Sequence, residues 1–422
     1  MFTDDFRPAP YWWDHAPRED PTPADLPKTV DVLVIGSGYT GLHAALRAAR
    51  AGRSVLVVEA QAPGHGASSR NGGQISTSVK PGKAALIRKY GAETANGILA
   101  DGQASREYIE EFVRSEDIAC DFKVPGRFHG AHTARQYDKL AAGAGVNDAF
   151  MVPRASQHEE LGTNAYFGGI VYPHHASLHP GRYHAGLLEK VRAAGVQLVS
   201  HCPVEALEPE NGVTRVRTRH GSVKAGRVIV ATNGYTTGLT PSLQRRVIPI
   251  GSYIIATEEL PKAVMDRLMP KDRILSDTRS LVYYYRPSPD RKRILFGGRV
   301  SLRETDARAT APLLRAELIR LFPELGDVRI SHSWSGFVGY TFDSLMHIGQ
   351  DGGIYYAMGY CGSGVGMASY LGMKLGLMAV DDPAGKTTLA KLPFPGRPYY
   401  RGDPWFLAPS IAAYRLRDRL GF

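Results

Sequence analysis

Three glycines near the start of the chain have the spacing of a dinucleotide-binding turn. Gly36, Gly38 and Gly41 follow the apolar run 30–35, which has the length and β-branched content of a buried parallel strand. The first glycine permits a sharp bend, the second lets the backbone approach a pyrophosphate, and the third lets a helix pack on the strand. The helix predicted over 42–51 directs its first N–H groups at the phosphates, so negative charge is held without a basic side chain.

Glu59 supports the same prediction from the end of the next strand. It lies about 20 positions after Gly36, where a carboxylate can accept hydrogen bonds from both hydroxyls of an adenosine ribose. Its negative charge disfavours a 2′-phosphate. Glycine motifs also occur in ordinary turns, but here the strand, the turn, the helix and the distal glutamate agree, and this combination predicts a bound dinucleotide rather than an empty βαβ unit.

Two further glycine-rich turns, 231–234 and 359–366, each follow a predicted strand far downstream. One NAD needs only the first turn of the chain. FAD is longer and spans the crevice between two domains, where the helix behind 359–366 can direct N–H groups at the pyrimidine edge of a flavin. The two turns therefore favour FAD, and the alternative is that both only join strands to their neighbours.

A polar, glycine-dense loop at 63–74 is too unusual in composition to be a simple connector. Its segment 64–74, which ends in Arg-Asn-Gly-Gly-Gln, is the most specific of six motifs that point to one family. The other five are 283–290, 296–299, 334–336, 341–349 and 359–364. Together they resemble the FAD-dependent D-amino acid oxidase (DAO) superfamily, and within it most of all the γ-glutamylputrescine oxidase branch.

The resemblance implies noncovalent FAD, two-electron oxidation of a C–N bond to an imine, and hydrolysis of that imine to a carbonyl. The resemblance also implies that O₂ often reoxidises the flavin, with release of H₂O₂. By the same resemblance the first turn and Glu59 hold the ADP half of FAD, Val204 meets the adenine, and the loop and the last turn contact the flavin. The residues assigned to the cofactor are Gly36, Gly38, Tyr39, Thr40, Gly41, Glu59, Ala60, Ala67, Ser68, Ser69, Arg70, Asn71, Gly72, Gly73, Gln74, Val204, Ala231, Thr232, Gly234, Gly359, Tyr360, Gly362, Ser363, Gly364 and Val365.

Val338 departs from the family at a position that bears on the substrate. Glycine oxidase-like members carry an Arg for the substrate carboxylate four residues after the Trp of 334–338. A buried carboxylate without its bidentate Arg is costly, so we expect an amine rather than a simple α-amino acid. Sarcosine oxidases carry their flavin-bonding Cys near the same position, so a covalent link there is excluded. The segments 343–346 and 361–364 also differ from the branch, and the identity of the substrate stays open.

Hydride leaves an amine most readily when the nitrogen is neutral, so the protein must desolvate, orient and deprotonate the substrate. Aromatic walls suit this task because they attract the cation before it loses its proton. The candidate catalytic residues are Tyr253, Tyr284, Tyr285, Trp334, His347 and Tyr360. Core packing is the alternative for each aromatic residue, and His347 is either a base or a satisfied structural histidine. Arg70 either places positive charge near the flavin or holds its loop together, and Cys361 is expected to be a packing residue.

Charge and composition leave other functions open. The 422 residues carry a formal net charge of +10, part of it concentrated after Pro383. A basic tail on a protein with an anionic cofactor explains this excess, and without a nucleic-acid-binding signature we expect no nucleic-acid partner. The alternatives are a D-amino acid or opine dehydrogenase with another electron acceptor, a flavin-dependent RNA-modifying protein, and an NAD-dependent dehydrogenase.

Cysteine usage and hydropathy bear on the compartment. Three widely spaced cysteines indicate neither a disulfide framework nor a zinc site, and we expect no metal and a cytoplasmic location. The N-terminus lacks the layout of a secretory signal, and no apolar run reaches the roughly 18 residues of a transmembrane segment. The expected partners are a small amine or amino acid and O₂ or another electron acceptor.

The order of predicted elements indicates an α/β protein, with a discontinuous Rossmann-like FAD-binding domain and a second α+β substrate domain containing an antiparallel sheet. Helices are predicted over 83–90 and 92–115, and a long strand over 246–258. The expected division is an irregular leader (1–29), the FAD-binding domain (30–80, 180–245 and 330–400), the substrate domain (81–179 and 246–329) and a basic C-terminal tail (401–422). Ligands bind at the carboxyl ends of such strands, so the chemistry is expected beside the crevice between the domains.

Overall fold

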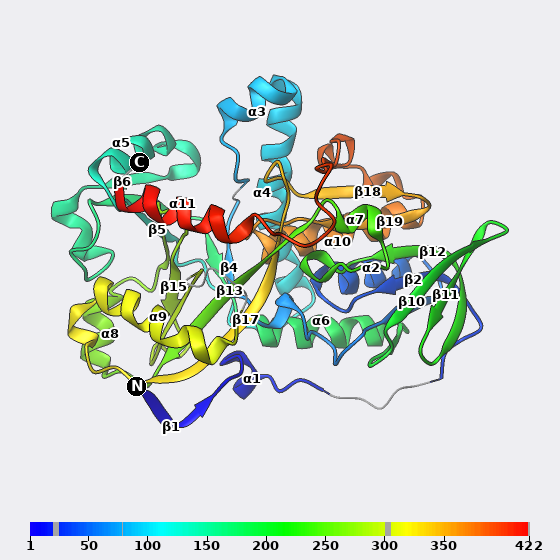
Figure 1. Cartoon of the computed structure of the whole chain (residues 1–422), viewed down its shortest axis with the longest axis horizontal. Helices are drawn as coiled ribbons and strands as arrows, with labels where there is room; N and C mark the ends of the chain where they lie inside the picture. The colour runs from blue at the N-terminus through cyan, green and yellow to red at the C-terminus, as the bar shows by residue number, and fades with distance from the viewer. Residues whose placement is uncertain (20–24, 78, 300–304, 421–422) are drawn as a thin grey trace.

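Two large β-sheets organise the chain, and they lie toward opposite ends of its long axis (Figure 1). The computed structural model describes residues 1–19, 25–77, 79–299 and 305–420. Residues 20–24 of the expected leader, 78 and 300–304 of the two expected domains, and 421–422 of the tail lie outside the described residues. One sheet is mainly parallel and the other mainly antiparallel, which confirms the predicted fold class.

The eight-stranded sheet has a parallel centre. Its order is β10-β11-β12-β2-β3-β9, with β19 beside β12 and β18 beside β19. Apolar cores cover both faces of the central strands, so β3 and the carboxyl-terminal parts of β2 and β12 are buried apolar runs. The strands are β2 (Thr29–Ile35), β3 (Val55–Val58), β9 (Gln197–Val199), β10 (Val204–Glu210), β11 (Val213–Thr218), β12 (Gly221–Val230), β18 (His347–Asp351) and β19 (Ile354–Met358).

Four helices share one hydrophobic core against this sheet: α2 (Tyr39–Arg50), α4 (Ala92–Ser115), α6 (Pro180–Ala193) and α10 (Gly364–Ala379). The predicted boundaries of α4 and of α3 (Lys83–Tyr90) are confirmed. Two glycines bring α10 onto α2, since a Cβ on Gly372 would lie 2.5 Å from Thr40 O and one on Gly376 would lie 2.5 Å from Ala44 O. The two helices therefore pack backbone to backbone.

The nine-stranded sheet has the order β1-β17-β13-β16-β15-β14-β5-β7-β6. One face packs with α8 (Lys262–Leu268) and α9 (Ala307–Leu321) around a second apolar core. The strands are β1 (Phe2–Arg7), β5 (Arg127–Gly130), β6 (Phe150–Val152), β7 (Gly169–Tyr172), β13 (Ile248–Thr257), β14 (Ile274–Asp277), β15 (Tyr284–Pro287), β16 (Ile294–Gly298) and β17 (Ile330–Tyr340). A small sheet pairs β4 (Gln74–Ile75) with β8 (Ala176–Ser177), and the short helices are α1 (Trp12–His15), α5 (Ala134–Leu140) and α7 (Pro241–Gln244).

Two segments lie elsewhere than the sequence predicts. The leader was expected to be irregular, but it begins with β1, which pairs in parallel with β17. The range 330–400 was expected in the FAD-binding domain, yet β17 pairs along its whole length with β13 of the other sheet. The cause is a long hydrogen-bonded ladder that no local sequence signal reveals. We therefore propose that the substrate domain ends with β17.

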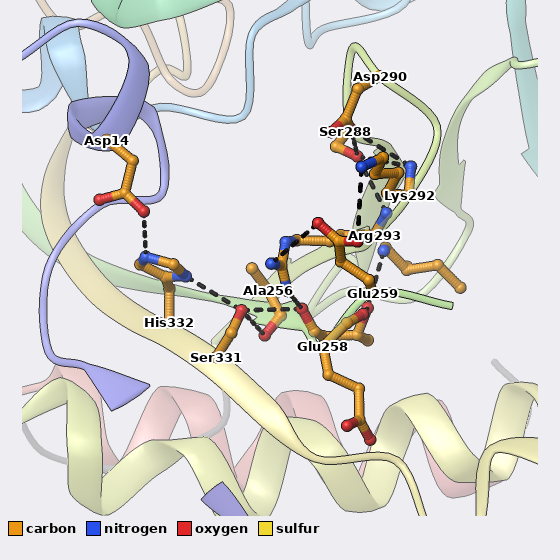
Figure 2. Close-up of polar contacts among 12 residues, drawn as sticks. Asp14, Ala256, Glu258, Glu259, Ser288, Asp290, Lys292, Arg293, Ser331 and His332 are labelled. Atoms are coloured by element: carbon orange, nitrogen blue, oxygen red, sulfur yellow. Dashed lines mark hydrogen bonds and ion pairs between the residues drawn. The ribbon is translucent and has the colours of Figure 1, made fainter. Parts of the chain in front are cut away.

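The leader is held on this sheet by polar contacts. His332 of β17 lies 2.9 Å from Asp14 through Nε2 and 3.0 Å from Ser331 Oγ through Nδ1 (Figure 2). Ser331 Oγ donates to Thr257 O at 2.8 Å. Trp12, fully buried, donates from Nε1 to Asn71 O at 2.8 Å. The leader thus connects β17 to the loop 64–74.

The C-terminal segment, expected as a basic tail, contains the helix α11 (Leu407–Leu420). Asp418 accepts hydrogen bonds from the backbone N–H groups of Ser280 (2.8 Å) and Leu281 (3.2 Å), just before β15. The tail is therefore attached to the strand that carries Tyr284. Among the described residues, no helix has the length and apolar character needed to cross a membrane.

Buried histidines make the stability of the fold sensitive to acid. Burial lowers the pKa of His43, His175, His179, His184 and His332, and the pKa of His179 falls to about 3. Below the unfolded-state pKa of about 6.5 the unfolded chain binds protons that the folded chain does not. The free energy of unfolding should therefore fall as the pH drops from about 7 to 5, by up to about 1.4 kcal/mol per pH unit for each such proton.

The variant His179→Asn tests this expectation. His179 caps α6 by accepting from Arg182 N at 3.1 Å, and Asn is a good substitute at such a position. Urea unfolding between pH 5 and 7.5 should show a shallower pH dependence for the variant than for the wild type. An unchanged slope would show that His179 does not contribute to acid sensitivity.

Candidate active site

The three glycine-rich turns meet at the carboxyl ends of β2, β12 and β19, which are neighbouring parallel strands. Ala231 N donates to Ile35 O at 2.9 Å, and a Cβ on Gly36, whose φ is +104°, would lie 3.2 Å from Ala231 O. Gly359 N donates to Asn233 Oδ1 at 2.9 Å. Turns separated by more than a hundred residues of sequence are therefore adjacent, as a single extended cofactor requires.

The first turn leads into the N-terminus of α2, whose N–H groups can meet a phosphate. Gly38 precedes α2 and provides no side-chain cap, and Tyr39 N donates to Ser68 Oγ at 2.9 Å. A Cβ on Gly41 would overlap the carbonyl oxygen of Gly36, so the turn closes only with glycine there. This cradle fits the pyrophosphate of a dinucleotide.

The start of α10 lies beyond the start of α2. Gly372 contacts Thr40 and Gly376 contacts Ala44, so the two helices run in the same direction. Gly372 is eight residues into α10, whereas its partner Thr40 is one residue into α2. The first residue of α10 therefore lies roughly seven residues, or about 10 Å at 1.5 Å per residue, beyond the first residue of α2. Ser363, the residue before α10, makes no side-chain cap, so this end also offers N–H groups. Two such ends at different depths fit FAD, with the pyrophosphate at one and the flavin edge at the other.

Glu59 lies beside the first turn. Its Oε2 accepts from Ser37 N (3.0 Å) and Ser37 Oγ (2.7 Å), and its Oε1 accepts from Gln61 N (3.1 Å). A carboxylate has about four acceptor positions, so hydroxyls of a ribose can still bind. Ala60 is exposed next to Glu59, and Val204 is half-buried at the start of β10.

The loop 64–74 is shaped by its own side chains. Ala67–Ser69 forms a short 3₁₀-helix, and Ser69 Oγ donates to Gly64 O at 2.6 Å. Asn71 donates from Nδ2 to Ser68 O (2.8 Å) and accepts from Gly73 N at Oδ1 (2.8 Å). The loop is therefore ordered by contacts that its Arg-Asn-Gly-Gly-Gln sequence supplies.

The same loop lies on the nine-stranded sheet. Trp334 donates from Nε1 to Arg70 O at 2.7 Å, and a Cβ on Gly72 would lie 3.2 Å from the Tyr284 ring. Gln74 donates from Nε2 to Tyr285 O at 3.0 Å. The loop thus joins the dinucleotide-binding turns to one face of the second sheet.

That sheet face carries a row of aligned residues across five strands. Trp334, Ile254, Gly297, Tyr284 and Ser276 are successive partners in register from β17 to β14. Because Gly297 has no side chain, the ring of Tyr284 lies over it, and its hydroxyl is 2.9 Å from Ser252 Oγ. Tyr284 and Trp334 are therefore the two predicted catalytic residues that face the loop.

Tyr253 and Tyr285 lie on the opposite face. Successive side chains of a strand alternate between faces, so each points away from the row that carries Tyr284. Both are packed in the apolar core beneath α9, and Tyr285 donates to the Tyr166 hydroxyl at 3.2 Å. The structure does not bring these two predicted catalytic residues to the site, because the pleat of the sheet turns them into its core.

His347 and Tyr360 also have structural surroundings. His347 is buried, its Nε2 lies 3.1 Å from Asp343 Oδ1, and its ring stacks on Phe394 with centroids 4.2 Å apart. The hydroxyl of Tyr360 lies 2.6 Å from Thr40 Oγ1 and joins the third turn to α2. Although His347 Nδ1 has no hydrogen-bond partner among the described residues, the contacts at Nε2 and at the ring favour a structural role over that of a base. Tyr360 has a role in positioning the cofactor turns.

Three residues that the sequence analysis did not single out complete the site. His184 Nε2 lies 2.8 Å from Ser37 O, and this contact stabilises the first turn. Ser252 is the hydrogen-bond partner of Tyr284. Ser37 lies inside the glycine motif and could have been found there, whereas His184 and Ser252 have no local signal because distant elements bring them in.

Two predictions about side-chain chemistry can be placed. Val338 is an alternate residue of β17 with Gly336 and Trp334, so the three share one face of the sheet. At position 338 this face carries Val rather than Arg. Cys361 is buried and donates from Sγ to Gly359 O at 3.1 Å, and burial raises its pKa to about 11. Its thiol is therefore protonated at neutral pH, as a packing residue requires.

Comparison with known proteins decides the family. The family model described as DAO, FAD dependent oxidoreductase, matches residues 31–376. The chain belongs to this family. Its cofactor is FAD, and the assigned turns are where an FAD of this DAO-family enzyme would be held.

Three similar proteins agree with this membership. The probable oxidoreductase OrdL of Rhizobium meliloti (strain 1021) is 31% identical over 421 residues, covering 97% of each chain. The gamma-glutamylputrescine oxidoreductase of Escherichia coli (strain K12) is 32% identical over 403 residues, covering 93% of this chain and 94% of that protein. The crystal structure of glycine oxidase from Geobacillus kaustophilus has the same fold, with a TM-score of 0.74 at 18% identity over 88% of this chain and 100% of that one.

Glu59→Gln tests the place of the ADP half. Loss of the charge weakens the hydrogen bonds to ribose, and charge-assisted bonds contribute about 1.5–3 kcal/mol, so FAD affinity should fall by about 10- to 100-fold. The measurement is fluorescence titration of the apo-protein with FAD. Glu205→Gln, at an exposed position of β10, is the control and should bind FAD normally. Full affinity in the Glu59 variant would contradict the assignment.

Proposed function

We propose that this FAD-dependent enzyme oxidises the C–N bond of an amine, such as a γ-glutamylputrescine-like, polyamine-derived or N-substituted amino compound. The product is an imine that water hydrolyses to a carbonyl, and O₂ accepts the electrons to give H₂O₂. The observation that carries the proposal is Val338, because β17 has no Arg for an α-carboxylate at this position, four residues after Trp334 and on the same face. The similarity to the Escherichia coli gamma-glutamylputrescine oxidoreductase supports the same class of substrate.

Bound FAD, held noncovalently, supplies a two-electron acceptor, and the protein contributes orientation and protonation. Burial raises the pKa of Tyr284 to about 12, so its hydroxyl stays protonated at neutral pH. Because Tyr284 Oη shares a hydrogen bond with Ser252, it can accept an N–H of the substrate while the nitrogen lone pair stays free. The row contains no acidic side chain at Trp334, Ile254, Gly297 or Tyr284. It therefore favours a neutral amine over an ammonium ion.

Arg70 supplies positive charge to the cofactor side of the site. Its Nε donates to His65 O (2.6 Å) and its Nη1 to Ser335 O (3.3 Å), both of them neutral carbonyls. It also lies over the ring of Trp13, 4.8 Å from the centroid. Its charge is therefore available to stabilise negative charge that develops on the cofactor, in addition to holding the loop.

We also propose a cytoplasmic location. Cys120, Cys202 and Cys361 are free and buried, which suits a reducing compartment. An extracellular pool of the protein with the same activity would contradict this location.

A substrate panel tests the proposed reaction. The purified enzyme is mixed without oxygen with γ-glutamylputrescine, putrescine, sarcosine, D-alanine or octopine while the visible flavin absorbance is followed. We expect γ-glutamylputrescine or putrescine to bleach the flavin faster than the amino acids, and air to restore the colour with formation of H₂O₂. Bleaching by D-alanine alone would contradict an amine substrate, and a colour that air does not restore would contradict an oxidase.

Two adjacent tyrosines provide a matched test of the sheet face. Tyr284→Phe removes the hydroxyl that meets the amine, so the rate of flavin reduction should fall by about 10- to 100-fold, as for loss of a positioned hydrogen bond. Tyr285→Phe removes a hydroxyl on the opposite face and should leave the rate within about 3-fold of the wild type. Equal effects of the two substitutions would contradict the assignment of the faces.

A further inference from the structure

Three basic side chains, Arg127, His129 and His175, gather beyond Tyr284, and we name them the Arg127 cluster. Arg127 and His129 are alternate residues of β5 and share one face, while the residue between them lies in the apolar core. Arg127 pairs in register with Tyr172, whose ring stacks on His175 with centroids 5.0 Å apart. The cluster is therefore on the same face of the sheet as Tyr284.

Arg127 is half-buried, and among the described residues it has no acidic partner of the kind that usually accompanies a buried arginine. Its Nη2 donates to Gln74 Oε1 at 3.4 Å, and its Nε has no hydrogen-bond partner within the described part of the chain. Burial lowers its pKa to about 10, so it remains cationic at neutral pH, and Tyr172 is the ionisable neighbour that opposes this shift. Desolvation without a counter-charge is costly, and an anion from outside the chain would offset it.

The two histidines add hydrogen-bonding groups to the cluster but no acidic side chain. His129 Nδ1 lies 2.8 Å from Ser276 Oγ, and His175 Nδ1 has no partner among the described residues. Burial first, and then neighbouring cations, lower the pKa of both, to about 3 for His129. The ionisable groups that act on His175 are Arg127, Arg106, His129 and His174, all of them basic. Both rings are therefore neutral at neutral pH and can donate a hydrogen bond to an anion.

The position of the cluster relates it to the substrate. Ser276 is paired with Tyr284 on one side and with His129 on the other, so His129 lies two strand spacings, or about 10 Å, from Tyr284. Gln74, the last residue of the loop 64–74, contacts both Arg127 and the strand that carries Tyr284. Arg127, His129 and Tyr284 are each half-buried, and the short side chain of Ser276 lies between the last two.

We propose that the Arg127 cluster, with Gln74, binds a carboxylate at the far end of the amine substrate. The inference rests on the proposed function, because it requires the reacting amine to lie at Tyr284. An arginine at the position of Val338 would hold a carboxylate next to the reacting carbon, whereas the Arg127 cluster, measured at His129, lies about 10 Å from Tyr284. An extended chain advances about 3.5 Å for every three bonds, so roughly nine or ten bonds separate the amine from the carboxylate. The substrate class is therefore a long-chain amine with a terminal carboxylate, and short α-amino acids cannot span the site.

Two synthetic amines isolate the effect of the carboxylate. N-glutarylputrescine carries a terminal carboxylate about ten bonds from its primary amine, and N-pentanoylputrescine has a methyl group in its place. We expect the wild-type holoenzyme to prefer the carboxylate compound by about 10- to 100-fold in kcat/KM for flavin reduction. Arg127→Met should abolish this preference while leaving kcat/KM for N-pentanoylputrescine within about 3-fold. Arg53→Met, at an exposed position before β3, should keep the full preference.

Three outcomes would overturn the proposal: no preference in the wild type, a full preference in Arg127→Met, or loss of the preference in Arg53→Met. Should Arg127→Met fail to retain FAD, Arg127→Lys replaces it, because it keeps the charge and loses the planar fork. A reduced preference in Arg127→Lys then supports the proposal, and an unchanged one contradicts it.

Calorimetric binding of N-butylglutaramate separates this proposal from the proposed function. This compound has the carboxylate and the chain but no reactive amine, and it should bind the wild-type holoenzyme more tightly than Arg127→Met by about 10-fold or more. If no amine bleaches the flavin but this difference is found, the proposed function fails and the carboxylate site stands. If amines bleach the flavin and the difference is absent, the carboxylate site fails alone.

Discussion

The backbone-to-backbone packing of α10 on α2 is the constraint on which the cofactor site depends. Gly372 and Gly376 face the backbone of α2 at Thr40 and Ala44, and a side chain at either glycine would force the helices apart. The contact sets the two helix starts at different depths, so one can meet phosphates and the other a flavin. Tyr360 and Thr40 join the third turn to α2 across the same contact. An FAD-binding site therefore follows from helix packing as much as from the first glycine motif.

The pleat of the nine-stranded sheet places two adjacent tyrosines on opposite faces. Tyr284 and Tyr285 are neighbours in sequence, yet one faces the loop 64–74 and the other fills the core beneath α9. A slip of one residue in register would exchange them. The loop stabilises the observed register, because Trp334 bonds to Arg70 and Gln74 bonds to the backbone of Tyr285. The cofactor-binding loop and the substrate-facing strands are thus ordered by the same hydrogen bonds.

Charge is distributed to suit anions at both ends of the site. Arg70 contacts neutral carbonyls on the cofactor side, and within the described ranges Arg127 has the amide of Gln74 as its side-chain partner. Between them the row is apolar or neutral, which suits an uncharged amine nitrogen. The net charge of +10, part of which the sequence analysis placed after Pro383, thus also includes cations inside the molecule. An anionic cofactor and the carboxylate that we propose at the far end of the substrate would complement that interior.

Local signals in the sequence determined the dinucleotide turn, the place of Glu59, the boundaries of α3 and α4, and the membership of the family. These depend on short-range chemistry: glycine conformations, hydrophobic periodicity and a loop whose side chains order it. Only the tertiary structure decided that β17 belongs to the second sheet, that Tyr253 and Tyr285 face the core, and that Arg127 lies on the same sheet face as Tyr284. Pairing between distant strands depends on register and on the face that becomes buried, and neither is written in any one segment.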